Sequence, residues 1–412
     1  MSSEFRRGWP VLVAAGLGIA FGASPIPFNS IGAFIPHLER EFGWGRGDIQ
    51  LAIFVFTVVV VVTVPIIGAM ADRFGVRPVA IATLTLFGLT YAALALTPAS
   101  IIGFYVLWGL MGLLGGGSTP VTWTRAINGW FDRNRGLALA VALMGTGVTA
   151  TFLPRLSVWL IDHVGWRWAF VGISLLPLGV ALPVVLIAFR DSPNSRPRSS
   201  TERHEAPAPP LTGVTLGQAI RNYRFWVLAL SILLVATGIG GTITNLQPLL
   251  IDKGFTAADA ASVAGLIGIS VVFGRLLAGW LIDRFWAPAV TFPMLVLPGV
   301  ACMFLAMAEI PVALAGLAAI MIGLAAGAET DLVAYLTARY FGLAHYGSIY
   351  GVQYGAFGLA SGFAPFLFGR VYDVAGTYNP ILYLASAFFG VGALALLTLG
   401  AYPKSEELPP RH

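Results

Sequence analysis

The stretch VPIIGAMADRFGVRPV, residues 64–79, carries an apolar run directly into a charged turn. Its Asp-Arg-Phe triplet, 72–74, stands at the end of the run, where a helix that leaves an oily phase should end in charge. The stretch LLAGWLIDRFWAPAV, 276–290, repeats this arrangement with the same triplet 211 residues later. An apolar helix that ends twice in the same charged turn indicates a duplicated structural unit.

A second pair of stretches supports the duplication. RAINGWFDRNRG, 125–136, and LTARYFGLAHYG, 336–347, align through Trp130-Phe131 and Tyr340-Phe341 with an offset of 210 residues. Because two separate features give nearly the same offset, the sequence predicts two similar halves.

The composition indicates a membrane protein. Of the 412 residues 57% are hydrophobic and 10% are charged, and the mean hydropathy is +0.81. Soluble domains carry about 25% charged residues, so this chain could not cover a soluble surface. Backbone groups in lipid must be bonded internally, which leaves helices or a closed barrel. The apolar runs are long and do not alternate, so the expected fold is all-α and embedded in a lipid bilayer.

Twelve spans are expected, in two pseudo-symmetric six-helix bundles. A polar segment rich in Pro, Ser and Arg, 190–221, separates residues 1–189 from residues 222–412 and reads as a flexible linker. The predicted spans are roughly 9–34, 47–70, 78–97, 101–128, 137–161, 166–188, 223–249, 259–282, 288–307, 311–338, 346–370 and 379–402.

The basic residues predict the orientation. Sixteen of the 24 Lys and Arg residues fall on the side of the termini and the linker, five fall on the other side, and three lie inside spans. Positive charge gathers on the cytoplasmic side, so both termini are expected to be cytoplasmic in a bacterial-type inner membrane. The net charge of +5 follows from this asymmetry and gives no support to nucleic-acid binding. The apolar run after Arg6 and Arg7 is expected to be a retained first helix, not a signal peptide.

The sequence offers no enzyme chemistry. Cys302 is the single cysteine and lies in an apolar run, and no pair of the five histidines has metal-ligand spacing. Walker and nucleophile-elbow patterns are absent, and the glycine-rich runs 109–118 and 264–274 read as close-packing helix surfaces. We therefore expect no enzyme activity, no metal and no cofactor. We also expect the chain to function as a monomer.

The stretch GAMADRFGVRP, 68–78, resembles the loop 2–3 signature of the major facilitator superfamily. With twelve spans and a central linker, the resemblance covers the whole chain. It implies the major facilitator fold and secondary transport by alternating access, in which two bundles rock about a midplane site. The charged residues expected to take part in gating at the linker side are Asp72, Arg73, Arg77, Arg125, Asp283 and Arg284.

A finer resemblance concerns the substrate. The Leu-Glu-x-Glu-Phe-Gly-Trp segment, 38–44, and the arginine of span eight, Arg275, resemble the monocarboxylate transporter family and the oxalate:formate antiporter. In those families that arginine binds the substrate carboxylate. Three positions depart from the patterns of similar families. Val271 stands where the mammalian monocarboxylate carriers have an aspartate, and Phe357 where the oxalate:formate antiporter has a lysine. Trp108 stands where many proton-coupled facilitators have an arginine. With fewer cations, the expected substrate is a small organic monoanion.

Arg275 stands eight residues before Asp283, well inside its span. A charge in the bilayer core is costly, but a guanidinium can bind a carboxylate through a two-point fork. Two readings stay open: Arg275 binds the substrate, or it forms a structural ion pair with Glu329 or Asp331. Those two are the only carboxylates expected inside a span, and they are also the candidates for proton coupling, against a purely structural role near the gate.

Further candidates for contact with the substrate are polar or aromatic residues near the midplane, each of which could equally be packing between helices: Asn29, Trp123, Arg155, Asn245, Gln247, Gln353 and Tyr354. Arg155 could also belong to an outer gate.

The prediction is a transporter of a small monocarboxylate, with proton symport. The alternatives are an exporter of amphipathic or neutral compounds in which Arg275 is structural, and a transporter-shaped sensor. The span-five stretch MGTGVTATFLPR, 144–155, lacks the Gly-Pro pattern of drug antiporters, which weighs against export.

Overall fold

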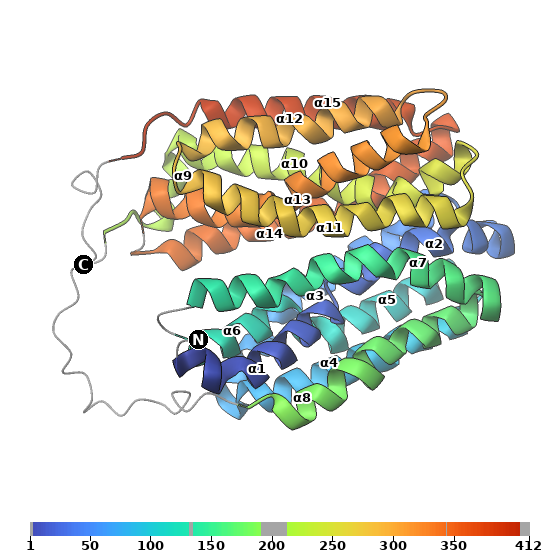
Figure 1. The fold of residues 1–412 in the computed structure, drawn as a ribbon, viewed down its shortest axis with the longest axis horizontal. Coiled ribbons are helices and arrows are strands. Elements are labelled where there is room, and N and C mark those ends of the chain that lie inside the picture. The colour runs from blue at the N-terminus through green and yellow to red at the C-terminus, as the bar shows by residue number, and fades with distance from the viewer. Residues whose placement is uncertain (1–2, 132–134, 191–211, 343, 404–412) are drawn as a thin grey trace.

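The computed structural model describes residues 3–131, 135–190, 212–342 and 344–403. Apart from one isolated bridge between Gly213 and Gly342, the regular structure in these residues is helical. The helices form two bundles that lie side by side (Figure 1). The all-α fold class is therefore confirmed.

The first bundle holds the helices that precede the central polar segment. Its α-helices are α1 (Ser3–Ala20), α2 (Pro25–Phe42), α3 (Arg46–Phe74), α4 (Val76–Ala93), α5 (Ile101–Gly115), α6 (Pro120–Trp130), α7 (Arg135–Leu175) and α8 (Leu182–Ala188). Short irregular turns join some of them: η1 (Leu94–Leu96), η2 (Gly116–Ser118) and η3 (Leu176–Ala181).

The second bundle follows that segment. Its helices are α9 (Leu216–Arg221), α10 (Tyr223–Asp252), α11 (Ala257–Ile282), α12 (Ala287–Leu305), α13 (Val312–Phe341), α14 (Tyr346–Ala375) and α15 (Asn379–Leu397). Residues 191–211 of the predicted linker lie outside the described residues. The end of the predicted linker is helical, because Thr215 and Gln218 form a capping box that starts α9.

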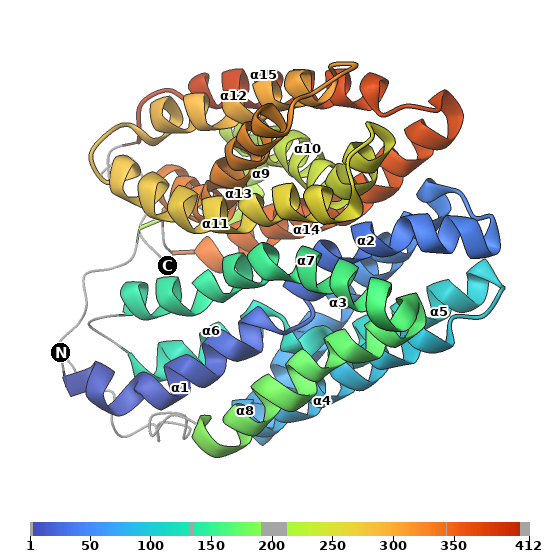
Figure 2. The same ribbon diagram turned by 45° about the vertical axis from the view of Figure 1, so that its right-hand side comes forward.

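The number of membrane crossings agrees with the prediction. Ten stretches of the described residues are long and apolar enough to span a bilayer. One of them, Gly136–Ala188, reverses direction at Gly165, whose φ of 81° breaks α7 into two passes (Figure 2). Helix α14, with 30 residues, is less apolar and supplies one more pass. The ten stretches, the extra pass and α14 together make twelve crossings.

Prolines explain the break in the first crossing. Helices α1 and α2 belong to one apolar stretch, Phe5–Phe42, but Pro25 stands at the start of α2. Proline has no N–H to donate to the preceding turn and is tolerated at the first helical position. The chain therefore ends α1 at Ala20 and restarts at Pro25.

Each bundle has its own apolar core. One cluster of buried side chains runs from Val11 to Phe189, with Ala261 as its only member from the second bundle, and the other runs from Ala219 to Leu399. Large apolar side chains such as Val62, Ile66 and Leu110 point outward and are exposed in the protein alone. A lipid environment would cover such a surface, as the composition predicts.

The two ends of the molecule differ, and the names used below refer to them. The linker end is where α1 begins, α8 ends, α9 begins and α15 ends; the far end holds the turn between α2 and α3 and the turn between α14 and α15 (Figure 1). Helices α3 and α11 run from the far end to the linker end, and α7 and α14 start at the linker end.

Close packing of α11 on α13 depends on Gly274, and we expect Gly274→Ala to destabilise the protein. A Cβ at this position would lie 2.7 Å from Leu324 Cα, too close for a real contact, so the helices would have to separate. Overpacking of this kind costs about 1–3 kcal/mol. Thermal unfolding followed by fluorescence-detected size exclusion measures the effect. Gly279→Ala on the same helix is the matched control, because nothing lies within 4 Å of its Cβ position. Equal melting temperatures for the two variants would contradict the packing argument.

Candidate functional site

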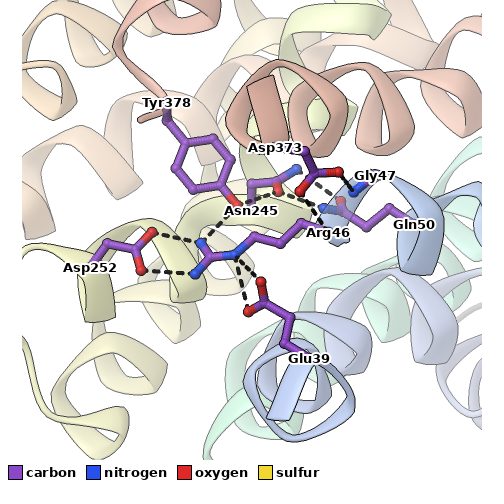
Figure 3. A network of polar contacts seen from close by, with 8 residues as sticks. All are labelled: Glu39, Arg46, Gly47, Gln50, Asn245, Asp252, Asp373 and Tyr378. Carbon is purple, nitrogen blue, oxygen red and sulfur yellow. Dashed lines mark hydrogen bonds and ion pairs between the residues drawn. The ribbon is translucent and has the colours of Figure 1, made fainter. Parts of the chain in front are cut away.

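A network of polar contacts centred on Arg46 joins the two bundles at the far end (Figure 3). Arg46 begins α3, and its side chain is 7% exposed. Its two terminal nitrogens bond both oxygens of Asp252 at the end of α10, at 2.6 and 2.9 Å. Its Nε donates to the two oxygens of Glu39 at 3.1 and 3.2 Å. One guanidinium therefore binds a carboxylate from each bundle, a geometry that only arginine provides.

Local structure brings Glu39 to Arg46. Helix α2 ends at Gly43, whose φ of 68° is the left-handed conformation that glycine adopts at helix ends. The chain then turns through Trp44, whose ring stacks on Phe42 at 4.4 Å, and α3 starts at once. This short turn folds the end of α2 back against the start of α3.

A carboxylate from the second bundle caps the start of α3. Asp373, near the end of α14, accepts hydrogen bonds from the backbone N–H groups of Arg46 and Gly47, each at 2.8 Å. The first N–H groups of a helix have no partner within the helix, and an anion there is stabilised by the helix dipole. Asp373 therefore fastens the two bundles together through the backbone of α3.

Three further side chains complete the far-end network, here defined as Glu39, Arg46, Gln50, Asn245, Asp252, Asp373 and Tyr378. Gln50 and Asn245 exchange amide hydrogen bonds at 2.7 and 2.9 Å, and both are buried. The Tyr378 hydroxyl donates to Asn245 Oδ1 at 2.9 Å and accepts from Arg46 at 3.2 Å. Burial raises the pKa of Tyr378, so this hydroxyl keeps its proton and remains a donor.

Other contacts hold the bundles together in the same half of the molecule. Arg155 on α7 donates from Nε to Ser262 Oγ on α11 at 2.9 Å. The rings of Phe54 on α3 and Phe363 on α14 meet edge to face at 5.3 Å. A Cβ at Gly32 of α2 would lie 2.9 Å from Thr244 O of α10. The bundles are therefore in direct contact throughout the far-end half.

The linker-end half is different. Among residues whose side chains the structure describes, no hydrogen bond or ion pair joins the two bundles there. The glycines of α14 show that the contact with α3 is present toward the far end of this helix and absent toward its linker end. Gly362 lies against Thr57 of α3, whereas Gly347, Gly351 and Gly355 have open space where a Cβ would stand. In the part of the chain that the structure describes, polar contacts therefore join the bundles at the far end and not at the linker end.

Arg275 stands beside this open half. Its Nε lies 3.1 Å from Asp331 Oδ2 on α13, and the two side chains are 14% and 38% exposed. Of the two predicted partners, the structure selects Asp331. No residue of the described chain bonds the terminal nitrogens of Arg275, so the fork of the guanidinium remains available.

Aromatic residues of α14 line the approach to Arg275. The rings of Tyr346, Tyr350, Tyr354 and Phe357 follow one another at 5.3 to 5.6 Å. Tyr354 is close enough to Arg275 to interact with it electrostatically, and Tyr350 to Asp331. Tyr354 also keeps 37% of its surface exposed, so it is a plausible contact for a molecule bound at Arg275.

Glu329 points elsewhere. It is 6% exposed and lines a small apolar cavity inside the second bundle together with Ser231, Thr291 and Leu295. Its Oε1 has no hydrogen-bond partner among the described residues. Glu329 therefore does not share the ion pair of Arg275 and Asp331.

The structure separates the remaining candidate contacts into groups. Asn29 and Gln247 meet across the two bundles and line one small polar cavity. Trp123 and Gln353 are each buried inside a single bundle, where they bond Ser118 O and Phe225 O, both at 3.1 Å. They are not brought to Arg275. Asn245 belongs to the far-end network, and Arg155 to the contacts beside it.

The predicted gating residues lie at the linker end. The side chain of Asp72 lies outside the described residues, and Arg73 lies over Phe74 at 5.3 Å. Three others donate to backbone carbonyls of their own bundle: Arg77 to Leu186 at 2.8 Å, Arg125 to Gly68 at 3.3 Å and Arg284 to Trp280 at 3.0 Å. Asp283 caps the end of α11. Each of the contacts named here lies within one bundle.

Sequence reasoning missed most of the far-end network. Glu39 and Arg46 were visible as charges next to a span, and Gln50 as a polar residue within one. Arg46 bonds Asp252, which follows it by 206 positions in the sequence, and Asp373, which follows it by 327. No local pattern joins residues at such distances.

Comparisons with known proteins agree with this arrangement. The family profile of the Major Facilitator Superfamily matches residues 17–365. The chain is 30% identical to mouse monocarboxylate transporter 11 over 291 residues, which cover 68% of this chain and 61% of that protein. It is 27% identical to bovine monocarboxylate transporter 13 over 95% of this chain and 89% of that one. It is 26% identical to a gallate transporter of Pseudomonas putida, over 67% and 66% of the two chains.

A solved structure shares the fold. It is a bacterial homologue of the human lysosomal transporter Spinster in an inward-facing, unoccupied conformation, with a TM-score of 0.69, 17% identity, and coverage of 98% of this chain and 100% of that chain. The resemblance to transporters of this kind is confirmed along most of the sequence. The protein is a multi-pass membrane transporter that belongs to the major facilitator superfamily.

Proposed function

We propose that the protein moves a small organic monocarboxylate across a bacterial-type inner membrane by alternating access, coupled to proton symport. The observation that carries the proposal is the guanidinium fork of Arg275: no described residue bonds its terminal nitrogens, while its Nε lies 3.1 Å from Asp331 Oδ2. A carboxylate fits such a fork with two parallel hydrogen bonds. Relatives named for monocarboxylates and gallate support the same class of substrate.

We also propose how the two halves move. Residues 1–189 and 222–412 rock against each other, 190–221 connects them, and each chain works as a monomer. With the linker end cytoplasmic, as the basic residues indicate, the structure corresponds to an inward-facing state. The far-end network is then the outer gate, and Arg155 supports it.

Asp331 is the proposed proton carrier. A second carboxylate beside one guanidinium would leave a net negative charge in a site of low dielectric, which is costly. The substrate therefore binds Arg275 favourably only when Asp331 carries a proton. Transport of the loaded carrier then moves one proton with each anion. Glu329 forms no ion pair with Arg275 among the described residues and is less suited to this role.

The second candidate function is export of amphipathic or neutral compounds. The ion pair of Arg275 with Asp331 agrees with this function, because an arginine with a purely structural role would form the same contact through Nε. The free fork of Arg275 weighs against it.

We expect Asp331→Asn to uncouple transport. Uptake of a panel of labelled monocarboxylates into proteoliposomes, with and without an inward proton gradient, is the measurement. The wild type should accumulate one acid about tenfold or more under the gradient, since a pH difference of one unit supplies about tenfold. Asp331→Asn should still exchange that acid across the membrane but should not accumulate it.

Glu309→Gln, an exposed carboxylate at the far end, is the matched control and should behave like the wild type. Accumulation that survives in Asp331→Asn would remove Asp331 from the coupling mechanism. If the wild type moves no acid in the panel, the carboxylate proposal is wrong and the export proposal takes precedence.

A further inference from the structure

A second pocket lies apart from the path between the bundles. It opens at the linker end of the second bundle, has a volume of about 570 Å³, and is formed by the end of α11, the start of α12, the end of α13 and the segment after α15. Pockets of this size hold small ligands. The lining residues with polar groups are Asp283, Arg284, Trp286, Tyr335, Arg339 and Tyr402.

The pocket carries two unneutralised cations. Neither Arg284 nor Arg339 forms an ion pair with a carboxylate of the described residues. Arg339 is held by aromatic faces, with its guanidinium 4.7 Å from the Tyr402 ring and 5.6 Å from the Tyr335 ring. Stacking of this kind fixes the cation but leaves its N–H groups free to bond a ligand. Asp283 is the one acid in the lining, so the pocket keeps a net positive charge.

The start of α12 follows directly on the pocket residue Trp286. The Tyr402 hydroxyl accepts the N–H of Ala287, the first residue of α12, at 3.0 Å. The dipole of this 19-residue helix also favours an anion at its start. Arg284 lies over the Trp280 ring at 4.3 Å and uses one nitrogen to bond Trp280 O. Two guanidinium groups with further N–H donors, next to a helix start, suit a phosphate group.

The neighbouring surface indicates where that phosphate comes from. Trp280 and Phe285 flank the pocket, and 52% and 59% of their surfaces are exposed. Aromatic side chains at the end of a span lie at the boundary between lipid and water. A headgroup phosphate at this depth would bring its acyl chains onto apolar side chains, which a soluble phosphate would leave uncovered.

We propose that this pocket binds the headgroup phosphate of an anionic phospholipid from the leaflet at the linker end. Basic pockets between membrane helices on the cytoplasmic side hold such headgroups in other proteins. The site is separate from Arg275 and does not depend on the transported substrate.

Native mass spectrometry of the purified full-length protein in detergent tests the proposal. Phosphatidylglycerol and phosphatidylcholine are added in turn, and bound lipid is counted. The wild type should retain phosphatidylglycerol about thirtyfold more readily, as two arginine contacts imply. The double variant Arg284→Gln/Arg339→Gln should lose this preference. Arg339→Lys keeps a charge and should retain most of it, which provides a readout if the double variant is unstable.

The control is Arg221→Gln, an exposed arginine of α9 at the same end but outside the pocket. It should bind phosphatidylglycerol like the wild type. An equal preference in the wild type and in Arg339→Gln would overturn the proposal. Displacement of the bound lipid by millimolar glycerol 3-phosphate, with no need for acyl chains, would overturn the lipid source and assign the pocket to a soluble phosphate.

Discussion

Arg275→Ala should reduce monocarboxylate uptake by about a hundredfold or more while leaving the protein folded. The loss of a charge-assisted two-point contact in a site of low dielectric costs about 3 kcal/mol, which corresponds to roughly this factor. The ion pair with Asp331 disappears as well, and Asp331 keeps its 38% exposure, so water can still solvate it. Uptake of the labelled acid into proteoliposomes measures the effect, with size exclusion to confirm folding.

Two further variants separate a substrate contact from a structural charge. Arg275→Lys keeps the charge but loses the fork, so uptake should stay far below that of the wild type. Arg275→Ala combined with Asp331→Asn restores charge balance in the helix pair. If Arg275 were only structural, this double variant would regain transport. We expect that it does not, because the carboxylate of the substrate then has no partner.

Arg46→Gln should open the far end. The variant removes the bonds to Glu39 and Asp252 and leaves two carboxylates facing each other across the bundles. Breaking a fully buried ion pair costs about 3–5 kcal/mol. Both carboxylates here remain 29% exposed, so we expect a smaller penalty, on the order of 2 kcal/mol. Such a change shifts the balance between the two conformations about thirtyfold.

Spin labels placed at Ala99 and Glu309 report this opening. Both residues are exposed in far-end turns, one in each bundle, and the native Cys302 is buried and therefore should escape labelling. The distance between the labels should lengthen in a large fraction of Arg46→Gln molecules. Arg40→Gln is the control, because Arg40 is exposed at the same end of α2 and outside the far-end network. A distance distribution in Arg46→Gln that matches the control would show that the network does not hold the far end closed.

The far-end network also explains the segment on which the finer family resemblance rests. Glu39 of that segment binds Arg46, and Glu41 accepts from Trp166 Nε1 at 2.6 Å and from Arg167 at 2.8 Å. Its Gly43 supplies the left-handed turn. In this chain the segment joins α2 to its neighbours at the far end. The proposed carboxylate contact, Arg275, is distant from this segment in sequence.

The sequence by itself determined the membrane environment, the all-α fold class and the number of membrane crossings. Those properties follow from the length and hydropathy of each run, which are local, and from the Asp-Arg-Phe repeat. It also placed Arg275 within its span, since depth along a helix depends only on residue count. The sequence analysis did not predict α9, which lies in the last part of the expected linker and is started by a capping box.

Only the tertiary structure decided which side chains meet. Glu329 and Asp331 are two residues apart, so they point about 200° apart around α13, and the packing of α11 on α13 turned Asp331 toward Arg275 and Glu329 into the bundle. Packing within each bundle placed Gln353 and Trp123 in the interior, and contact between the bundles placed Asn245 in the far-end network. Arg46 binds Asp252 and Asp373 because the two bundles touch at the far end. The rotation of each helix and the docking of one bundle on the other are set by contacts among many residues far apart in the chain, and no local pattern encodes them.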